Sequence, residues 1–159
     1  MIKENIKKIN DQIPQGITLV AVSKTKPSSA ILEAYEAGHR DFGENKVQEL
    51  ASKQAELPKD IRWHMIGHLQ RNKVKYIAPF VHLIHGVDSL NLLQEINKQG
   101  IRFNRIINCL LQFHIASEDT KFGLSHEKGI DLLNSSYFRE MKNIKIQGVM
   151  GMASFCNNE

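Results

Sequence analysis

The sequence predicts an α/β fold built on a parallel β-sheet. Short apolar segments alternate with amphipathic segments along the chain, and little separates one from the next. Alternation of this kind implies parallel strands joined by right-handed helical crossovers, in either a doubly wound sheet or a βα barrel. The clearest strand is the apolar run LVAV at residues 19–22, which polar residues and Pro27 bound. It presents Lys24 at its carboxyl end, where parallel sheets bind their ligands.

The other elements follow in order after a helix at the amino terminus. In residues 1–9 the isoleucines Ile2, Ile6 and Ile9 recur at the spacing of an amphipathic helix, which is not the pattern of a signal peptide. Strands are expected at residues 18–23, 41–43, 63–67, 83–87, 106–115 and 144–152. Further helices are expected at residues 27–38, 44–56, 70–78, 89–99 and 127–136. Gly100 is expected to end the helix at residues 89–99.

Composition indicates one ordinary globular domain spanning residues 1–159. Hydrophobic residues make up 42% of the chain and charged residues 24%, which is the balance of a soluble globular protein. The apolar runs are far shorter than the ~20 residues that a membrane span needs. We therefore expect a cytoplasmic protein without a transmembrane helix.

Charge and motifs argue against several classes of partner. The net charge is +4, but the lysines are scattered along the chain. Basic and aromatic residues do not interleave in a patch that would bind nucleic acid. Neither GxGxxG nor GxxxxGKS/T occurs, which counts against a dinucleotide or nucleoside triphosphate site. Cys109 and Cys156 are unlike a disulfide framework, and Cys109 is expected to be a buried thiol. We expect no metal site among the cysteines and the seven histidines.

Polar residues stand at or near the ends of four predicted strands. They include Lys24, Glu44, Asn45, His64 and Asp88, and a site on the carboxyl edge of the sheet would produce such a pattern. Each residue has a simpler alternative role. Asn45 and Asp88 stand where helix caps are common, and His64 could be a core histidine bonded to the backbone. The pattern therefore carries more weight than any one of its members.

Lys24 is the candidate with a specific chemistry. It shares strand parity with Val20 and Val22, so its side chain is expected on the same face of the sheet. Partial burial there, together with the charge of Lys26, would lower the pKa of its ammonium group. The unprotonated amine could then form a Schiff base with an aldehyde. The alternative is that both lysines extend to solvent at the strand terminus.

Five motifs together resemble the pyridoxal phosphate homeostasis proteins. They are AVSKTKP at residues 21–27, FGEN at 42–45, WHMIGHLQRNK at 63–73, VDS at 87–89 and SEDTKFG at 117–123. The motifs occur in the order and spacing of that family, and the resemblance extends from Thr18 to Met152. Five motifs in register make it specific, whereas AVSK alone would be weak.

The resemblance implies a βα (TIM-type) barrel of the alanine racemase N-terminal domain type. Such a barrel would hold pyridoxal 5′-phosphate as an internal aldimine on Lys24. Asn45 and His64 would lie near the cofactor ring, and Lys121 matches a family lysine in the loop after the fifth strand. Family members resemble carriers that buffer pyridoxal phosphate and deliver it to apo-enzymes, so no residue is expected to be catalytic.

The chain departs from the family pattern in two places. Lys46 stands where family members usually have an aromatic residue after FGEN. The chain also ends soon after GVMGMAS at residues 148–154, before two further βα units whose GMSxD and RxG segments hold the phosphate in the family. Six strands are counted where a closed barrel has eight. We therefore expect an open, truncated barrel with weakened cofactor binding.

Two other functions stay open at this point. A pyridoxal-dependent amino-acid racemase would need a tyrosine or cysteine opposite Lys24, whereas Tyr35, Tyr76 and Tyr137 all fall in predicted helices. The missing phosphate-binding segments would instead suit an interaction module or remnant that binds no cofactor.

Overall fold

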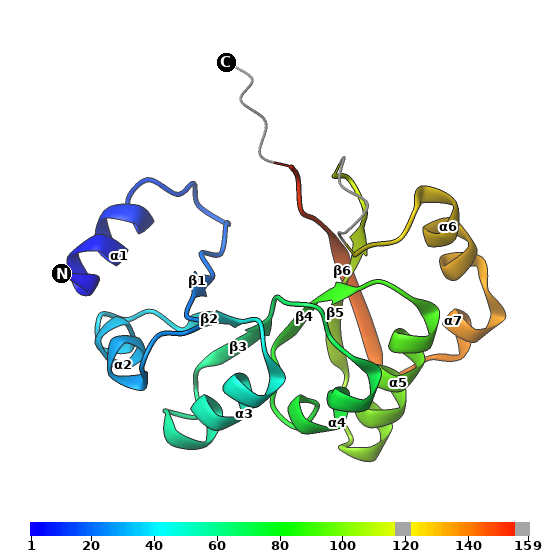
Figure 1. Ribbon diagram of the computed structural model, residues 1–159, viewed down its shortest axis with the longest axis horizontal. Helices are drawn as coiled ribbons and strands as arrows, with labels where there is room; N and C mark the ends of the chain where they lie inside the picture. Colours follow the sequence, from blue (N-terminus) through cyan, green and yellow to red (C-terminus); the bar gives the residue numbers. More distant parts are fainter. Residues whose placement is uncertain (117–121, 155–159) are drawn as a thin grey trace.

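Six parallel strands form one sheet in which the spatial order equals the sequence order (Figure 1). The computed structural model describes residues 1–116 and 122–154. The strands are β1 (Ala21–Val22), β2 (Asp41–Glu44), β3 (Arg62–Met65), β4 (Leu83–Val87), β5 (Ile107–Phe113) and β6 (Ile144–Gly151). All six predicted strands are confirmed, although β1 is shorter than the predicted span.

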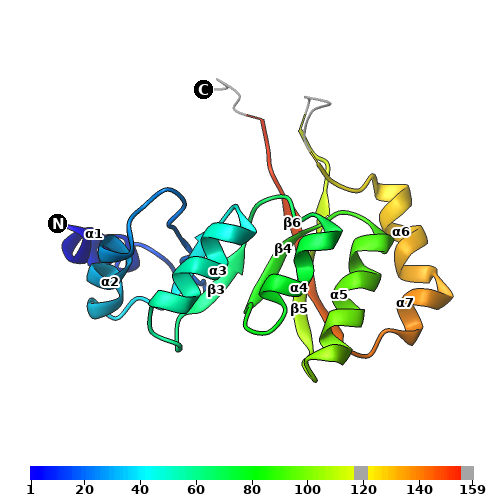
Figure 2. The same cartoon turned by 60° about the horizontal axis from the view of Figure 1, so that its bottom comes forward.

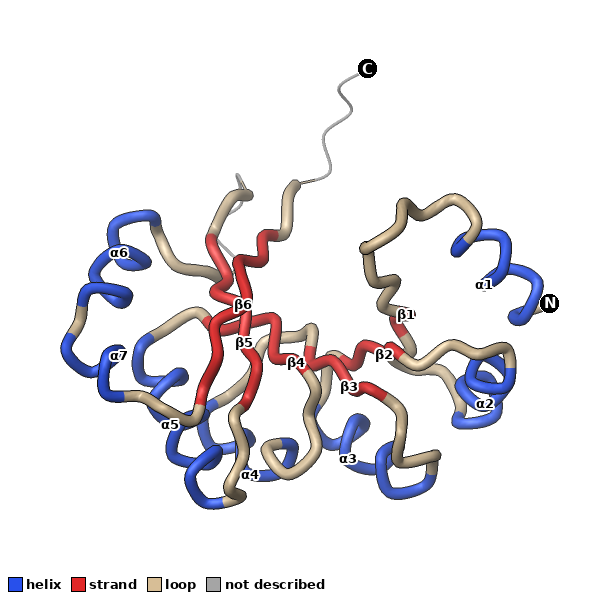
Figure 3. The backbone as a smooth tube through the Cα atoms, turned by 180° about the vertical axis from the view of Figure 1, so that it is seen from behind, coloured by secondary structure: helices blue, strands red, loops and turns tan. Residues whose placement is uncertain are grey.

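Helices lie outside the sheet, with α1 before β1 and the others between successive strands (Figures 2 and 3). They are α1 (Ile2–Asn10), α2 (Ser28–Glu36), α3 (Val47–Glu56), the 3₁₀ helix η1 (Arg71–Lys73), α4 (Val74–Ile77), α5 (Leu90–Arg102), α6 (His126–Asn134) and α7 (Ser136–Glu140). Because the strand order never reverses, the sheet has no topological switch point and is of the barrel type, not doubly wound. Among the described strands, β1 and β6 each pair with one neighbour, so the barrel is open.

The hydrophobic core fills the space between the sheet and its helices. Alternate strand residues face it: Phe42, Trp63, Met65 and Ile84 are at most 1% exposed. The rings of Phe42 and Trp63 lie with their centroids 6.1 Å apart. The helices contribute fully or almost fully buried side chains, namely Ile31, Leu50, Val74, Ile77, Leu92, Leu93, Ile96 and Leu132. Cys109 is a buried free thiol as predicted, and Cys156 lies outside the described residues.

Gly100 does not end a helix, because α5 continues through it to Arg102. A Cβ atom at position 100 would lie 2.6 Å from the backbone oxygen of Asn143. Glycine therefore lets α5 pack closely against the segment that leads into β6.

Helix α7 is absent from the predicted elements. Its N-cap is Ser135, whose hydroxyl accepts a hydrogen bond from the N–H of Phe138 at 3.2 Å. The described helices include none with the length and apolar character needed to cross a membrane.

Two isoleucines on α5 test the contribution of the core to the free energy of unfolding. Ile96 is fully buried, whereas Ile101 is 61% exposed. Ile96→Ala leaves a cavity and should lower the free energy of unfolding by about 2–5 kcal/mol. Ile101→Ala should change it by less than about 0.5 kcal/mol. Urea unfolding followed by the fluorescence of Trp63 measures both values, and equal losses would contradict the assignment of the buried face of α5.

Candidate functional site

A cavity of about 480 Å³ lies at the carboxyl edge of the sheet. We call it the Lys24 cavity. It brings together Lys24, which follows β1, and Asn45, which follows β2, as their positions at parallel strand ends predict. The segment after β3 and the carboxyl-terminal parts of β5 and β6 complete the wall. The lining residues are Val22, Lys24, Asn45, Ile66, Gly67, His68, Gln112, Phe122, Met150 and Met152.

The strand register explains which of the predicted residues meet. Gly43 of β2 pairs with Val22 of β1 and with His64 of β3. Lys24 and Asn45 each stand two residues beyond that level, toward the carboxyl edge. His64 therefore lies about 7 Å nearer the amino edge than Lys24 and Asn45 do, although all three are on the same face of the sheet. It lines a second cavity, and the structure does not bring it to the wall of the Lys24 cavity.

Lys24 lies on the face that strand parity predicts, but it is not buried. Val22 and Lys24 line the same cavity. Both residues are exposed, and the exposed fraction of Val22 is 54%. The expectation of partial burial is wrong because β1 is an edge strand, to which only β2 pairs among the described strands. A small molecule can consequently reach the amine of Lys24 from solvent.

A tight turn presents Lys24 at this edge. The N–H of Lys26 donates to the carbonyl of Ser23 at 3.0 Å, and Thr25 between them has a φ of 63°. That left-handed conformation is unfavourable for a β-branched residue. The N–H of Thr25 donates to Oε1 of Glu49 at 2.6 Å. The turn is thus stabilised by a contact from α3 and not by the conformational preference of Thr25.

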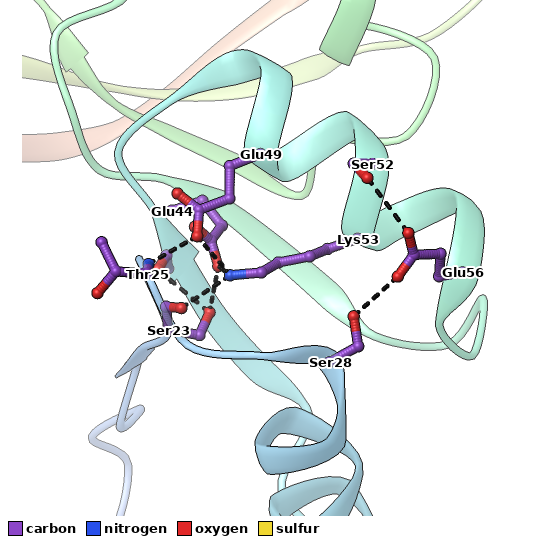
Figure 4. A network of polar contacts seen from close by, with 9 residues as sticks. Ser23, Thr25, Ser28, Glu44, Glu49, Ser52, Lys53 and Glu56 are labelled. Carbon is purple, nitrogen blue, oxygen red and sulfur yellow. Dashed lines mark hydrogen bonds and ion pairs between the residues drawn. The ribbon is translucent and has the colours of Figure 1, made fainter.

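Lys53 of α3 forms a buried ion-pair network beside this turn (Figure 4). Its Nζ lies 2.7 Å from Oε1 of Glu44, 2.7 Å from Oε1 of Glu49 and 2.8 Å from the carbonyl oxygen of Ser23. The hydroxyl of Ser23 also donates to Glu44 at 2.6 Å. Glu44 is fully buried and Lys53 is 6% exposed. The hydrogen bond from Lys53 lowers the pKa of Glu49, and the network fixes the ends of β1 and β2 to α3.

A stacked pair of rings forms part of the cavity wall. The ring centroids of His68 and Phe122 are 3.7 Å apart, with 10° between the ring planes. Nδ1 of His68 lies 3.4 Å from Oδ2 of Asp88. Asp88 does not cap α5 as expected, because Ser89 does so by accepting the N–H of Leu92 at 3.2 Å. Local sequence does not identify His68 as a cavity residue, because its ring partner, Phe122, is distant along the chain.

The tyrosines that a racemase could use lie away from Lys24. Tyr35 and Tyr76 are on α2 and α4, which correspond to predicted helices, and Tyr137 is on α7, beyond the helix predicted at residues 127–136. Among the described residues that line the Lys24 cavity there is neither a tyrosine nor a cysteine. Lys121 lies outside the residues that the structure describes.

A second cavity, of about 470 Å³, lies nearer the amino edge on the same face of the sheet. We call it the histidine cavity, and it is lined by Thr18, Val20, Asp41, Arg62, His64, His82, Leu83, His85 and Gln147. Nε2 of His64 lies 3.0 Å from Oδ1 of Asp41, and its Nδ1 lies 2.9 Å from Nε2 of His85. Arg62 donates to Oδ1 and Oδ2 of Asp41 at 2.8 and 2.5 Å.

Burial and charge set the protonation states in the histidine cavity. Burial alone would raise the pKa of Asp41, but hydrogen bonds from Arg62 and His64 outweigh it and lower the pKa. Burial lowers the pKa of His64 and lowers that of His85 to about 4. The pKa of His82 is also lowered, by partial desolvation of a ring whose side chain remains exposed. The three imidazoles are therefore neutral, and the carboxylate is ionised, near neutral pH.

Comparison with known proteins places this architecture in a family. The alanine racemase N-terminal domain family matches residues 1–159. The pyridoxal phosphate homeostasis protein of Aquifex aeolicus is 36% identical over 161 residues, which cover 99% of this chain and 70% of that protein. The chain belongs to the pyridoxal phosphate homeostasis protein family. Another relative, from Pseudomonas aeruginosa, is 36% identical over 95% of this chain and 70% of its own length.

Solved structures of relatives share the fold. PipY of Synechococcus elongatus is 34% identical. Its structure without pyridoxal phosphate aligns with a TM-score of 0.87 over 95% of this chain and 70% of PipY. Its structure with pyridoxal phosphate bound aligns with a TM-score of 0.84 over 96% of this chain and 71% of PipY. Alanine racemase from Bartonella henselae is 15% identical and aligns with a TM-score of 0.70. The alignment covers 94% of this chain and 42% of the racemase chain. That likeness concerns the fold alone. The family resemblance and the barrel-type fold are thus confirmed.

The buried ion pair predicts a large and specific loss of stability. Lys53→Met leaves the carboxylate of Glu44 buried without its cation, and should lower the free energy of unfolding by about 3–5 kcal/mol. Lys46→Met, which removes an exposed lysine at the start of the same helix, should cost less than about 0.5 kcal/mol. The double variant Glu44→Gln/Lys53→Met should recover part of the loss, because no unpaired charge remains. Urea unfolding measures all three, and similar losses for the two single lysine variants would refute the role of the pair.

The lowered pKa of Asp41 predicts a loss of stability in acid. Since its pKa is lower in the folded than in the unfolded state, its contribution is fully present above the unfolded value of about 3.9. This contribution disappears as the pH falls through the folded value. Asp41→Asn should therefore flatten the decline in unfolding free energy below about pH 4, measured by urea unfolding between pH 7 and pH 3. Asp131→Asn on the exposed face of α6 is the control, and an equally steep decline in both variants would count against this account.

Proposed function

We propose that the chain binds pyridoxal 5′-phosphate at the Lys24 cavity and acts as a non-catalytic carrier in pyridoxal phosphate homeostasis. The observation that carries the proposal is a lysine at the carboxyl end of a parallel strand, facing a cavity at the edge where barrels bind ligands. Membership of the pyridoxal phosphate homeostasis protein family and the structure of PipY with pyridoxal phosphate bound support the same ligand.

The lining of the Lys24 cavity fits the parts of this cofactor. Pyridoxal phosphate supplies an aldehyde, with which a lysine amine can condense. Ile66, Met150 and the stacked ring of Phe122 offer apolar surface to a flat ring. Asn45 adds an amide that can donate or accept hydrogen bonds. Lys24 is the residue that would hold the cofactor, and Asn45 would orient it.

The proposal leaves His64 outside the contact set. A direct contact between His64 and the cofactor stays a prediction from the family resemblance. Its side chain is held by Asp41 and His85 in the histidine cavity, about 7 Å nearer the amino edge than Lys24. We therefore assign cofactor contact to Lys24 and Asn45. We also propose that residues 1–159 form one domain.

A carrier function suits this site better than turnover. A racemase moves a proton with an acid or base opposite the lysine, and the described lining residues include no tyrosine or cysteine. Lys24 is exposed, so bound cofactor would be accessible for transfer. We propose apo-enzymes that use pyridoxal phosphate as the recipients. The cytoplasmic location expected from the sequence stays a prediction.

Cofactor binding by two neighbouring lysines tests the proposal. The purified chain is mixed with pyridoxal phosphate, the absorbance of lysine-bound cofactor is recorded, and the sample is reduced with borohydride for peptide mapping. The label should map to Lys24. Lys24→Ala should lose the absorbance band and bind at least about tenfold more weakly, equivalent to about 1.4 kcal/mol.

Lys26→Ala is the matched control, since Lys26 is also exposed and lines a different cavity beside α1 and α2. It should bind like the unaltered chain. Absence of the band in the unaltered chain would reject cofactor binding and favour the interaction module. Turnover of an amino-acid enantiomer by the loaded chain would instead favour the racemase reading.

A further inference from the structure

Three potential metal ligands from neighbouring strands meet in the histidine cavity. Asp41 is the first residue of β2, His64 lies in β3, and His82 directly precedes β4. One ligand atom from each lies within 4.8 Å of the other two. The ring centroids of His64 and His82 are 5.3 Å apart. The cluster lies apart from the Lys24 cavity, so the proposed function makes no use of it.

We propose that Asp41, His64 and His82 bind a divalent transition-metal ion of the zinc class. Two imidazole nitrogens and one carboxylate oxygen form a ligand set that zinc commonly uses, with a fourth position open to water. Here that position would face the histidine cavity, which has room for a water molecule. Magnesium and calcium would be poor occupants, because they prefer oxygen ligands.

The ligand atoms need only a small movement to reach bonding geometry. Nitrogen and oxygen ligands about 2 Å from a tetrahedral zinc ion lie about 3.3 Å apart. Nε2 of His64 and Oδ1 of Asp41 already lie 3.0 Å apart. His82 is exposed, and its ring has no hydrogen-bond partner among the described residues. A rotation of the His82 side chain can therefore close the site without disturbing the core.

His85 supplies the outer support that metal-binding histidines need. A ligating histidine usually donates its other ring N–H to a neighbour, which fixes its tautomer and orientation. Nδ1 of His64 faces Nε2 of His85 at 2.9 Å. When Nε2 of His64 binds the ion, the proton of that ring stands on Nδ1 and is donated to Nε2 of His85. The proton of His85 then stands on its own Nδ1. Both rings are still neutral, each in its other tautomer. The number of bound protons is unchanged.

Arg62 limits the affinity of this site without blocking it. Its guanidinium donates to both oxygens of Asp41, and its positive charge opposes a bound cation. Each carboxylate oxygen can accept two partners, so Oδ1 can keep the Arg62 contact and exchange the His64 proton for the metal. The same contact holds the carboxylate in a fixed orientation. We therefore expect weaker binding than at a closed site with four protein ligands.

The proposal departs from the expectation, drawn from local sequence spacing, that the histidines form no metal site. Sequence spacing does place His64 and His68 four residues apart, but the two side chains line different cavities. The proposed ligands are instead separated by about twenty residues, one on each of three successive strand units. Parallel pairing brings them together, and local spacing carries no sign of it.

Metal titration of the full chain tests the proposal. The chain is prepared without an affinity tag, stripped with EDTA and titrated with Zn²⁺ by calorimetry and with Co²⁺ by visible absorption. The unaltered chain should bind one equivalent of either ion, with Co²⁺ giving the intense visible bands of a four-coordinate site. His82→Ala should bind at least about tenfold more weakly, and His85→Phe about 10–100-fold more weakly.

Two controls keep the outcome interpretable. His126→Ala removes an exposed histidine of α6 and should leave the affinity unchanged, as should Lys24→Ala. His82 is exposed, so His82→Ala should keep the circular dichroism of the unaltered chain. Absence of binding by the unaltered chain would overturn the proposal. So would unaltered affinity in His82→Ala, because the ion would then bind elsewhere. Neither result depends on whether pyridoxal phosphate binds at Lys24.

Discussion

Parallel pairing of the strands in sequence order is the constraint on which the rest of this structure depends. Every strand must begin at the same edge, so each connection crosses back outside the sheet as a helix. The carboxyl ends then gather at one edge, and side chains alternate between the helix-covered face and the opposite face. The approach of Lys24 and Asn45 to one cavity follows from these two consequences together with the register of β1 on β2.

The ion pair between Lys53 and Glu44 connects the two faces. Glu44 shares the parity of Phe42 and points toward α3, whereas the next residue, Asn45, lines the Lys24 cavity. Burying two charges costs desolvation, and an apolar pair of similar volume would often be as stable. An apolar side chain could not, however, bind the carbonyl of Ser23 as Lys53 does. The network thus stabilises a particular position of the strand end that carries Lys24.

Features that repeat along the chain could be predicted from the sequence, whereas features set by tertiary contacts could not. The span of β4 is predicted correctly, because an apolar run between turn residues determines it locally. The face on which Lys24 lies also follows from strand parity. Its exposure does not, since it depends on β1 being at an edge of the sheet. Gly100 has the local signature of a helix end, and only its approach to Asn143 shows why α5 continues through it.

The same alternation that places Lys24 also separates it from the histidines. Val20, just before β1, and Val22 of β1 share one face, yet Val20 lines the histidine cavity and Val22 the Lys24 cavity. Two residues along a strand span about 7 Å, which is enough to divide this face into two sites of different chemistry. The Lys24 site combines residues that follow strands, such as Lys24 and Asn45, with paired strand residues such as Val22. The histidine site lies within the ladder, where Asp41 and His64 are fixed by pairing on β2 and β3. An ion in the histidine cavity would join Asp41 of β2 and His64 of β3 to His82, which precedes β4, and would stabilise the folded sheet by mass action.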